Sequence, residues 1–533
     1  MSTVAPLMVA VTMAVDASDF CYDVTHFGAV GDGITDDTKA FVAAAAAAAP
    51  TAACVRVPPV RLGGGFVLSS TVSLAPGVSL IGEAAGFAPN PHCYGPPGDF
   101  NTTGGSRILA RPATSSLNAT AGTGAPLFHL LGTGCSVRGL MVLYDRVPFP
   151  TDAEMERLYP TFEAARRGFV ADHVPPFGPT FYITAGVRVQ ITDVIGAGFR
   201  HLIYFAGRGH GMSHIRRVQG WGWDTLVTVV EAQDVLTFEQ LRFTINSGPW
   251  CLGARPAACD HEAEGIERCR GNFTVLPAVV ALRPSNVMLW MGRADGYVAR
   301  DLFGFGVHTA LRLGSAPGEY QLRDPVTGSG HRFLAQASAQ RLGTSGACTA
   351  SEPHATLPFG AQPGASGPWG SVSQLMADQC VYGIHLVWPN PLTNRISDVQ
   401  LHPSFWLRGS SLAAANGSGT DLSAVGLEAG VMVEPSHSLT NNNGLVPTLI
   451  LSSLVVASFN DSANFGPAGA MLGQSNGRAF LIGGDGLVDV RGFAMNNERD
   501  GDTHMWARTS ASVGRLRMTS VVLNYEWADD VLV

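Results

Sequence analysis

The chain repeats a short step in which two apolar residues enclose two residues that are mostly polar. Its nine copies occupy residues 137–140, 191–194, 215–218, 238–241, 299–302, 396–399, 451–454, 490–493 and 518–521. Val194 to Val218 spans 24 residues and Val218 to Leu241 spans 23, about the length of one coil of a β-helix. Because one unit is too short to bury its own apolar face, only stacking of units creates a core.

This repeat predicts an all-β chain wound as a single-stranded parallel β-helix, a solenoid of about ten coils. Charged residues make up only 14% of the chain, which is typical of short strands joined by turns. A β-sandwich is the alternative, but its hairpins need Asn-Gly-type turns that are scarce here. Gaps in the repeat predict insertions at about residues 247–272 and 323–370, with the coil pattern resuming at Val381.

The N-terminal segment carries a second specific pattern. Residues 24–27 begin as a short apolar strand, which breaks at three glycines suited to positive φ: Gly28, Gly31 and Gly33. The Asp-Asp-Thr sequence at residues 36–38 then predicts a side-chain cap and the start of a helix that ends at Pro50.

Together with the apolar segments at 55–58, 64–68 and 78–83, this order closely resembles the N-terminus of the pectate-lyase superfamily. The resemblance covers roughly residues 22–83 and points to the branch with rhamnogalacturonase-like and epimerase-like relatives. It implies a right-handed parallel β-helix whose open N-terminal end is plugged by the helix. Residues 18–83 would then form the cap and first coil, and residues 84–533 the β-helix with its insertions.

Several features favour a secreted, extracellular or cell-wall protein. Residues 1–17 are expected to form a signal peptide, with an apolar run at 5–15 and small residues before a cleavage site after Ala17. Five Asn-x-Ser/Thr sequons predict glycosylation at Asn101, Asn118, Asn272, Asn416 and Asn460. No later run is long enough to predict a membrane span.

The nine cysteines show no CxxC spacing, which disfavours a zinc site and favours a few disulfides with one thiol left over. The net charge of −8 argues against a nucleic-acid partner. It also means that an acidic polysaccharide would need local cations to bind.

Aligning the coils places similar residues in columns. The aligned segments are 198–203, 222–227, 306–311 and 380–385, with 275–280 as a further coil between the second and third. Phe199, Trp223, Val307 and Val381 form an apolar column that we expect to point inward. The next column contains Arg200, Asp224, His308 and Tyr382, with His201 beside it.

Neighbouring strands in such a stack lie ~4.8 Å apart, so this second column would project into one groove. Arg200 could neutralise a uronate carboxylate, and His308 or Tyr382 could remove or return the C5 proton, as β-elimination or C5 epimerisation requires. Asp224 would orient a partner or hold a cation. Because Pro277 would lie in the coil between them, Asp224 and His308 should be ~10 Å apart. The alternative is a solvent-facing column of mixed polar residues.

The resemblance also bears on these columns, because related polygalacturonases place their catalytic carboxylates at about this point of the coil. The Gly-His-Gly sequence around His210 resembles a polygalacturonase element. The Asn-Thr-Asp, Asp-Asp and Arg-Ile-Lys elements that should accompany it are missing, so we interpret His210 as a turn residue and find little support for a hydrolase with paired carboxylates.

Asp260 and Glu262 lie in an acidic stretch of the first insertion, between Cys251 and Cys269. Their oxygens would suit Ca²⁺ in a lid over the groove, and the alternative is a solvated, disulfide-linked loop. No other cofactor is expected.

Two function classes remain. One is a secreted polysaccharide-active enzyme: a lyase, epimerase or glycoside hydrolase on a uronate-containing glycan. The other is a non-catalytic β-helix that serves as a carbohydrate-binding, cell-wall or virion surface protein. The fold hosts both classes, so only the site can discriminate between them.

Overall fold

The structure is a computed structural model. It describes residues 21–61, 64–83, 105–112, 125–146, 150, 152–160, 162–184, 186–206, 210–232, 234–244, 279–280, 283, 285–314, 368–378, 380–386, 393–402, 429–433, 448–458, 478–482, 487–497, 507–509 and 515–523. The expected signal peptide, all five sequons, Pro277, Asp260 and Glu262 lie outside these residues.

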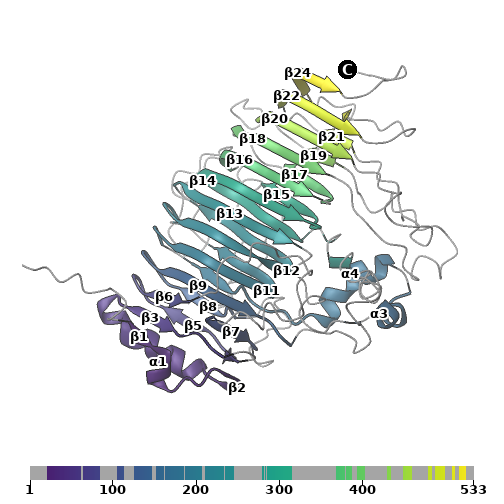
Figure 1. Ribbon diagram of the computed structural model, residues 1–533. Coiled ribbons are helices and arrows are strands. Elements are labelled where there is room, and N and C mark those ends of the chain that lie inside the picture. Colours follow the sequence, from purple (N-terminus) through teal and green to yellow (C-terminus); the bar gives the residue numbers. More distant parts are fainter. Residues whose placement is uncertain are drawn as a thin grey trace, which may run out of the picture.

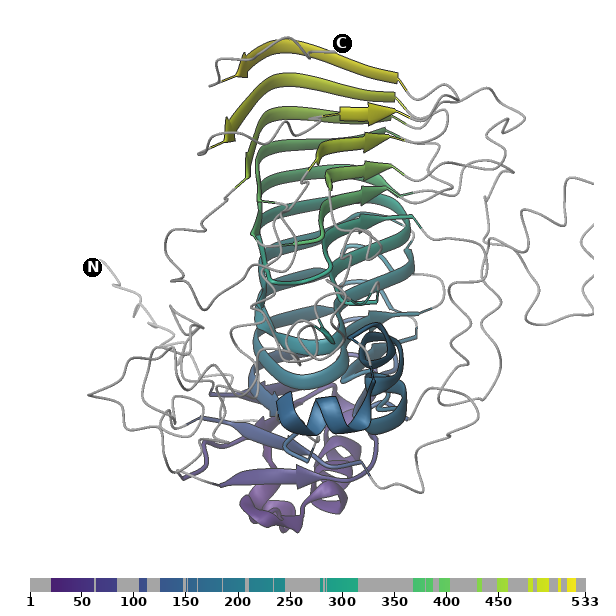
Figure 2. The same cartoon turned by 90° about the vertical axis from the view of Figure 1, so that its right-hand side faces the viewer.

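The described chain winds as a right-handed parallel β-helix (Figures 1 and 2). Sheet 1 is a ladder of β1 (Tyr22–Asp23), β3 (Cys54–Val57), β6 (Ser79–Gly82), β9 (Ser136–Leu143), β11 (Gln190–Phe205), β12 (His214–Ala232), β13 (Leu236–Thr244), β14 (Val287–Phe305), β16 (Trp369–Asp378), β18 (Thr393–His402), β20 (Thr448–Ser458), β22 (Leu487–Asn497) and β24 (Arg515–Leu523). These thirteen rungs exceed the ten expected.

Two further sheets complete each coil. Sheet 2 contains β2 (Asp32–Asp36), β4 (Gly65–Leu68), β7 (Arg107–Ala110) and the last residues of the sheet-1 strands from β9 onward. Sheet 3 contains β5 (Val72–Leu74), β8 (Phe128–Leu130), β10 (Phe181–Ile183), parts of β11, β12 and β14, and then β15 (Thr309–Leu313), β17 (Tyr382–Leu386), β19 (Ala429–Val433), β21 (Arg478–Ile482) and β23 (Ala507–Thr509). Figure 1 shows the sheet-3 strands β15, β17, β19 and β21 along one flank of the solenoid. The strands β14, β16, β18 and β20 lie along the other flank.

The repeated four-residue step is the corner between sheets 1 and 2. Its third residue has positive φ in ten coils: Gly139, Asp193, Arg217, Gln240, Asp301, Gln374, Asp398, Ser453, Gly492 and Ser520. The left-handed conformation of the third residue turns the chain, while the apolar first and fourth residues of the step point into the core. None of these ten residues is β-branched, which fits the steric cost of positive φ.

The tenth copy of the step, at residues 372–375, was missed because it follows the second insertion. The coil pattern resumes at Trp369, where β16 begins, and not at Val381. The predicted insertion through residue 370 therefore overlaps only the first two residues of β16, Trp369 and Gly370, whereas the predicted resumption at Val381 was too late.

The helix α1 (Thr38–Ala48) lies against the first coil, and the α1 residues Phe41, Ala44, Ala45 and Ala48 are buried in the core (Figure 1). The capping helix is thus confirmed, but two details differ. Val24–Phe27 is a 3₁₀ turn and not a strand, because the Asp23 side chain accepts a hydrogen bond from the backbone N–H of Thr25. A second short 3₁₀ turn, Ala49–Thr51, follows α1.

Asp37 precedes α1 but does not cap it through its side chain. Its buried carboxylate instead accepts hydrogen bonds from the backbone N–H groups of Val30, Gly31 and Val67. Asp36 makes the local contact, accepting from the N–H of Thr38 at 3.0 Å. Asp37 therefore links the glycine turn to β4.

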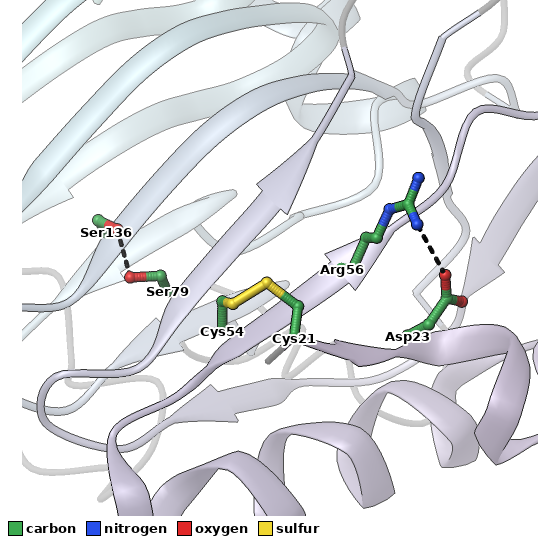
Figure 3. The surroundings of a disulfide bond; sticks show 6 residues. All are labelled: Cys21, Asp23, Cys54, Arg56, Ser79 and Ser136. Atoms are coloured by element: carbon green, nitrogen blue, oxygen red, sulfur yellow. Dashed lines mark hydrogen bonds and ion pairs between the residues drawn. A yellow bond between two sulfur atoms is a disulfide. The ribbon is translucent and has the colours of Figure 1, made fainter. Parts of the chain in front are cut away.

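Four of the nine cysteines lie in the described residues. Cys21 and Cys54 form a disulfide across β1 and β3, beside the Arg56–Asp23 ion pair (Figure 3). Cys135 and Cys380 are buried free thiols, and burial raises the pKa of each. The expected disulfide pairing is confirmed in one case, whereas the expectation of a single unpaired cysteine is wrong because both buried cysteines fill core positions.

Two helices that the sequence reading did not anticipate interrupt the coil after β9. They are α3 (Asp152–Leu158) and α4 (Phe162–His173), and α4 places Phe169 against Trp223 with ring centroids 5.9 Å apart. No helix among the residues described above is long and apolar enough to cross a membrane.

Candidate functional site

The expected inward column is confirmed. Phe199, Trp223, Val307 and Val381 are all buried in the main core. The residues that follow them in each coil begin sheet 3. In β11, Ile203 and Phe205 point into the main core, so Tyr204 between them points to the outer face.

One register row on this outer face is rich in aromatic and basic side chains over seven consecutive rungs. It consists of His129, Tyr182, Tyr204, Thr228, Trp290, Arg312 and His385. A parallel row consists of His201, Thr225, Val287, Thr309 and Tyr382. These rows carry the candidate site.

Asp224 is the centre of a buried ionic cluster at one end of the site. Its carboxylate accepts a hydrogen bond from Arg200 Nε at 2.7 Å and from Ser285 Oγ at 2.7 Å, and Arg283 Nη1 lies 3.0 Å away. The Asp224 side chain is only 2% exposed. Burial alone would raise the pKa of Asp224, but the Arg200 and Arg283 guanidiniums outweigh burial and hold this pKa well below its usual range.

The partners of this cluster are positioned by the adjoining backbone. Arg283 Nη1 also donates to the carbonyl of Trp223, and the carbonyl of Arg283 accepts the backbone N–H of Asn286. The Asn286 side chain donates to the Gly222 carbonyl at 3.0 Å. The turn before the sheet-3 part of β14 is thereby fixed against β12.

His201 lies beside the ionic cluster and is partly exposed. Its Nδ1 is 2.8 Å from the Thr225 hydroxyl, which is 2.7 Å from the Thr228 hydroxyl. Burial lowers the pKa of His201 to about 4. The imidazole is therefore neutral at neutral pH, although Asp224 is close by.

A second cluster lies further along sheet 3. The ring of Tyr382 contacts His308 edge-on at a centroid distance of 5.3 Å and His385 at 5.0 Å. On the neighbouring rung, the Arg312 guanidinium lies 4.3 Å from the centroid of the Trp290 ring. Tyr382 is the partly exposed member, whereas His308 and His385 are buried.

The predicted column is thus divided in two. Arg200 and Asp224 meet, with His201 beside them, and His308 meets Tyr382. Asp224 and His308 are buried, whereas Arg200 and Tyr382 are partly exposed, so the column is neither wholly buried nor wholly solvent-facing.

Two register assignments were wrong. Tyr382 pairs with Thr309 and not with His308, so it stands one residue further along the strand than predicted. The coil between Asp224 and His308 is not formed by residues 275–280: the described part, residues 279–280, is helical, and Asn286 takes this place just before Val287 pairs with Thr225. The expected separation of two rungs, ~10 Å, still holds.

His210 is a fully buried turn residue, as the sequence favoured. Its Nε2 is 2.6 Å from the Ala206 carbonyl, and burial lowers the pKa of His210. It lies between coils, outside the two clusters.

Sequence reasoning missed Arg283, Ser285, Arg312, Trp290 and His385. Arg283 and Ser285 precede a strand after an insertion, where no repeat marks them. His385 lies three residues after Tyr382, a spacing that regular strand alternation places on opposite faces, so the sequence did not indicate their contact. Among the described residues no group of three or more His, Cys, Asp or Glu could hold a metal ion, and the proposed calcium ligands lie outside them.

Comparisons with known proteins agree with this architecture. Residues 21–90 match the family model described as rhamnogalacturonase A/epimerase, pectate lyase-like. No curated protein sequence is significantly similar to the chain.

Similar solved structures include an exopolygalacturonase from Thermotoga maritima (11% identity, TM-score 0.42, covering 94% of this chain and 91% of that one). Others are the mannuronan C-5 epimerase AlgE4 A-module of Azotobacter vinelandii (10%, 0.38, 95% and 98%) and the surface protein and adhesin PfbA of Streptococcus pneumoniae (10%, 0.38, 95% and 99%). At these identities and TM-scores the likeness carries no argument about function. The chain is thus similar to the pectate-lyase-like family over residues 21–90, and its described strands form a parallel β-helix.

Proposed function

We propose that this protein is a secreted polysaccharide-active enzyme that acts on a uronate-containing glycan. The observation that carries the proposal is the second cluster, in which a phenol lies between two imidazoles beside a guanidinium. Tyrosine and histidine are acid–base groups, and arginine is suited to a carboxylate.

The chemistry favoured is removal of the proton at C5 of a uronate. A cation on the sugar carboxylate stabilises the charge that develops when this proton leaves. The electron pair can then expel the glycosidic oxygen at C4, which leaves an unsaturated product and a new chain end. Alternatively, a proton returned to the opposite face of C5 gives the epimer. Tyr382, with His308 or His385, would exchange these protons.

Hydrolysis by two carboxylates is less well supported, because Asp224 is held ionised by two guanidiniums. A non-catalytic glycan-binding protein is the second candidate. It is favoured by the burial of His308 and His385, which limits access to their rings.

Activity on a panel of polyuronates tests the proposal, with absorbance of an unsaturated product, reducing ends and NMR of C5 configuration as readouts. Tyr382→Phe and His308→Gln should each lose ~10²-fold or more in kcat. Tyr22→Phe and His26→Gln, in the N-terminal cap, are matched controls and should retain activity. Folded Tyr382→Phe and His308→Gln variants with full turnover would exclude this cluster, and binding without turnover would favour the second candidate.

Secretion is part of the proposal. The Cys21–Cys54 disulfide supports it, because disulfides persist in oxidising compartments. Mass spectrometry of protein from a eukaryotic host should find a mature terminus near Ser18 and glycans on some of the five sequons. An intact Met1 with unmodified sequons would contradict this expectation.

A further inference from the structure

The ionic cluster around Asp224 has unequal charge. Two guanidiniums, Arg200 and Arg283, share one carboxylate, and the neighbouring His201 is neutral at neutral pH. Counting only the residues that the structure describes, the cluster therefore carries an excess of one positive charge. Since a buried charge without a counter-ion is unfavourable, such a cluster favours an anion from outside.

Both arginines can reach a ligand. The side chains of Arg200 and Arg283 are 19% and 15% exposed, in contrast to the 2% of Asp224. A guanidinium carries five N–H donors. Arg200 uses its Nε toward Asp224, and Arg283 uses its Nη1 toward Asp224 and the Trp223 carbonyl. The other N–H groups of these two guanidiniums suit the two oxygens of a carboxylate.

The cluster is too far from the second cluster to hold the reacting group. The Asp224 end of the site is on β12, His308 immediately precedes β15, and β14 lies between these two strands in sheet 3. Two strand spacings amount to ~10 Å, and Tyr382 on β17 is one rung further away. This separation exceeds the length of a single pyranose ring.

We propose that Arg200 and Arg283, held in place by Asp224, form an anion-binding subsite for a uronate carboxylate on a different sugar residue from the one that reacts at Tyr382. The inference rests on the proposed function, and it adds a requirement for chain length. The substrate must be an oligomer or polymer that lies along the solenoid axis and reaches both clusters. Asp224 is a positioning residue in this arrangement.

Defined oligouronates of increasing length test this subsite, with KM and kcat measured for each. KM should fall steeply once the oligomer reaches both clusters. Arg283→Gln should raise KM for long oligomers by ~10- to ~100-fold, the loss expected for a hydrogen bond to a charged group, with kcat and the short oligomers unchanged. This variant leaves a neutral Arg200–Asp224 pair, so it should fold. Arg283→Lys retains the charge and should recover part of the affinity.

Arg395→Gln is the matched control, because Arg395 is an exposed arginine on sheet 1. Calorimetric binding of the same oligouronates to the Tyr382→Phe variant, with and without Arg283→Gln, separates this inference from the proposed function. If the wild-type protein shows no activity but the oligouronates bind, and Arg283→Gln weakens this binding, the subsite would be supported while the proposed function fails. Activity with no dependence on oligomer length, equal effects of Arg283→Gln and Arg395→Gln, or no binding at all would overturn the subsite.

Discussion

Replacement of Asp224 by Asn tests whether its carboxylate is the ionic anchor of the site. The substitution keeps the side-chain size but leaves Arg200 and Arg283 without their shared counter-ion in a site where Asp224 is 2% exposed. Breaking a buried pair costs 3–5 kcal/mol, and the partial exposure of both arginines points to the lower end, ~3 kcal/mol. For a chain of 533 residues that unfolds as one unit, the melting entropy is ~1 kcal/mol/K, so Tm should fall by ~3 °C.

Asp193→Asn is the matched control, since Asp193 also pairs with an arginine, Arg217, but both side chains are about one-third exposed. An exposed pair contributes ~0–1 kcal/mol, and Asn tolerates the positive φ of this corner residue. Differential scanning calorimetry compares the two variants. Adding Arg283→Gln to Asp224→Asn removes one of the two excess charges and should recover part of the lost stability. Equal Tm values for Asp224→Asn and Asp193→Asn would refute the role of Asp224 as an anchor.

Three further predictions concern stability. The pKa of His201 is about 4 in the folded protein and ~6.5 in the unfolded chain, so its contribution to the free energy of unfolding should fall by up to ~3 kcal/mol as pH drops through this window. Identical pH profiles of Tm for wild type and His201→Gln would contradict this. Ser453 has φ 52°, so Ser453→Gly should stabilise by up to ~1 kcal/mol and Ser453→Val should destabilise by ~1–2 kcal/mol in denaturant titrations; the opposite order would disprove the corner argument. Ala45→Asp should lower Tm by burying a charge under α1, whereas Ala46→Asp on its exposed side should not, and equal melting curves would count against the cap.

The architecture could be predicted from the sequence because each corner of the solenoid imposes a local requirement. A residue with positive φ must stand between two inward apolar residues, and this requirement returns in each described coil from β9 to β24. Among the ten corners that the structure describes, the sequence pattern missed the one at Gln374, which follows the second insertion. The helices α3 and α4 could not be found in this way, because they belong to an insertion that does not repeat.

The site was harder to predict than the fold, because lateral neighbours depend on register while the repeat fixes only the corner. His201, Thr225, Thr309 and Tyr382 all follow their corner at the same spacing, so Tyr382 was misplaced by one residue because the corner at residues 372–375 had been missed. The same uncertainty hid Asn286, whose coil follows a long insertion. The sequence predicted the residues of one column, but it did not predict which of them are in contact.

The division of the predicted column also changes what its residues can do together. A single column of Arg200, Asp224, His308 and Tyr382 implied one reacting centre, in which Asp224 could assist proton transfer. With Asp224 saturated by arginines and two rungs from His308, its carboxylate can act only through the guanidiniums that it holds. Under the proposed function, acid–base chemistry is then assigned to Tyr382 and its two histidines. In this proposal, the rung spacing of the β-helix separates recognition from reaction along the axis, and a polymeric substrate is the kind of ligand that could use both.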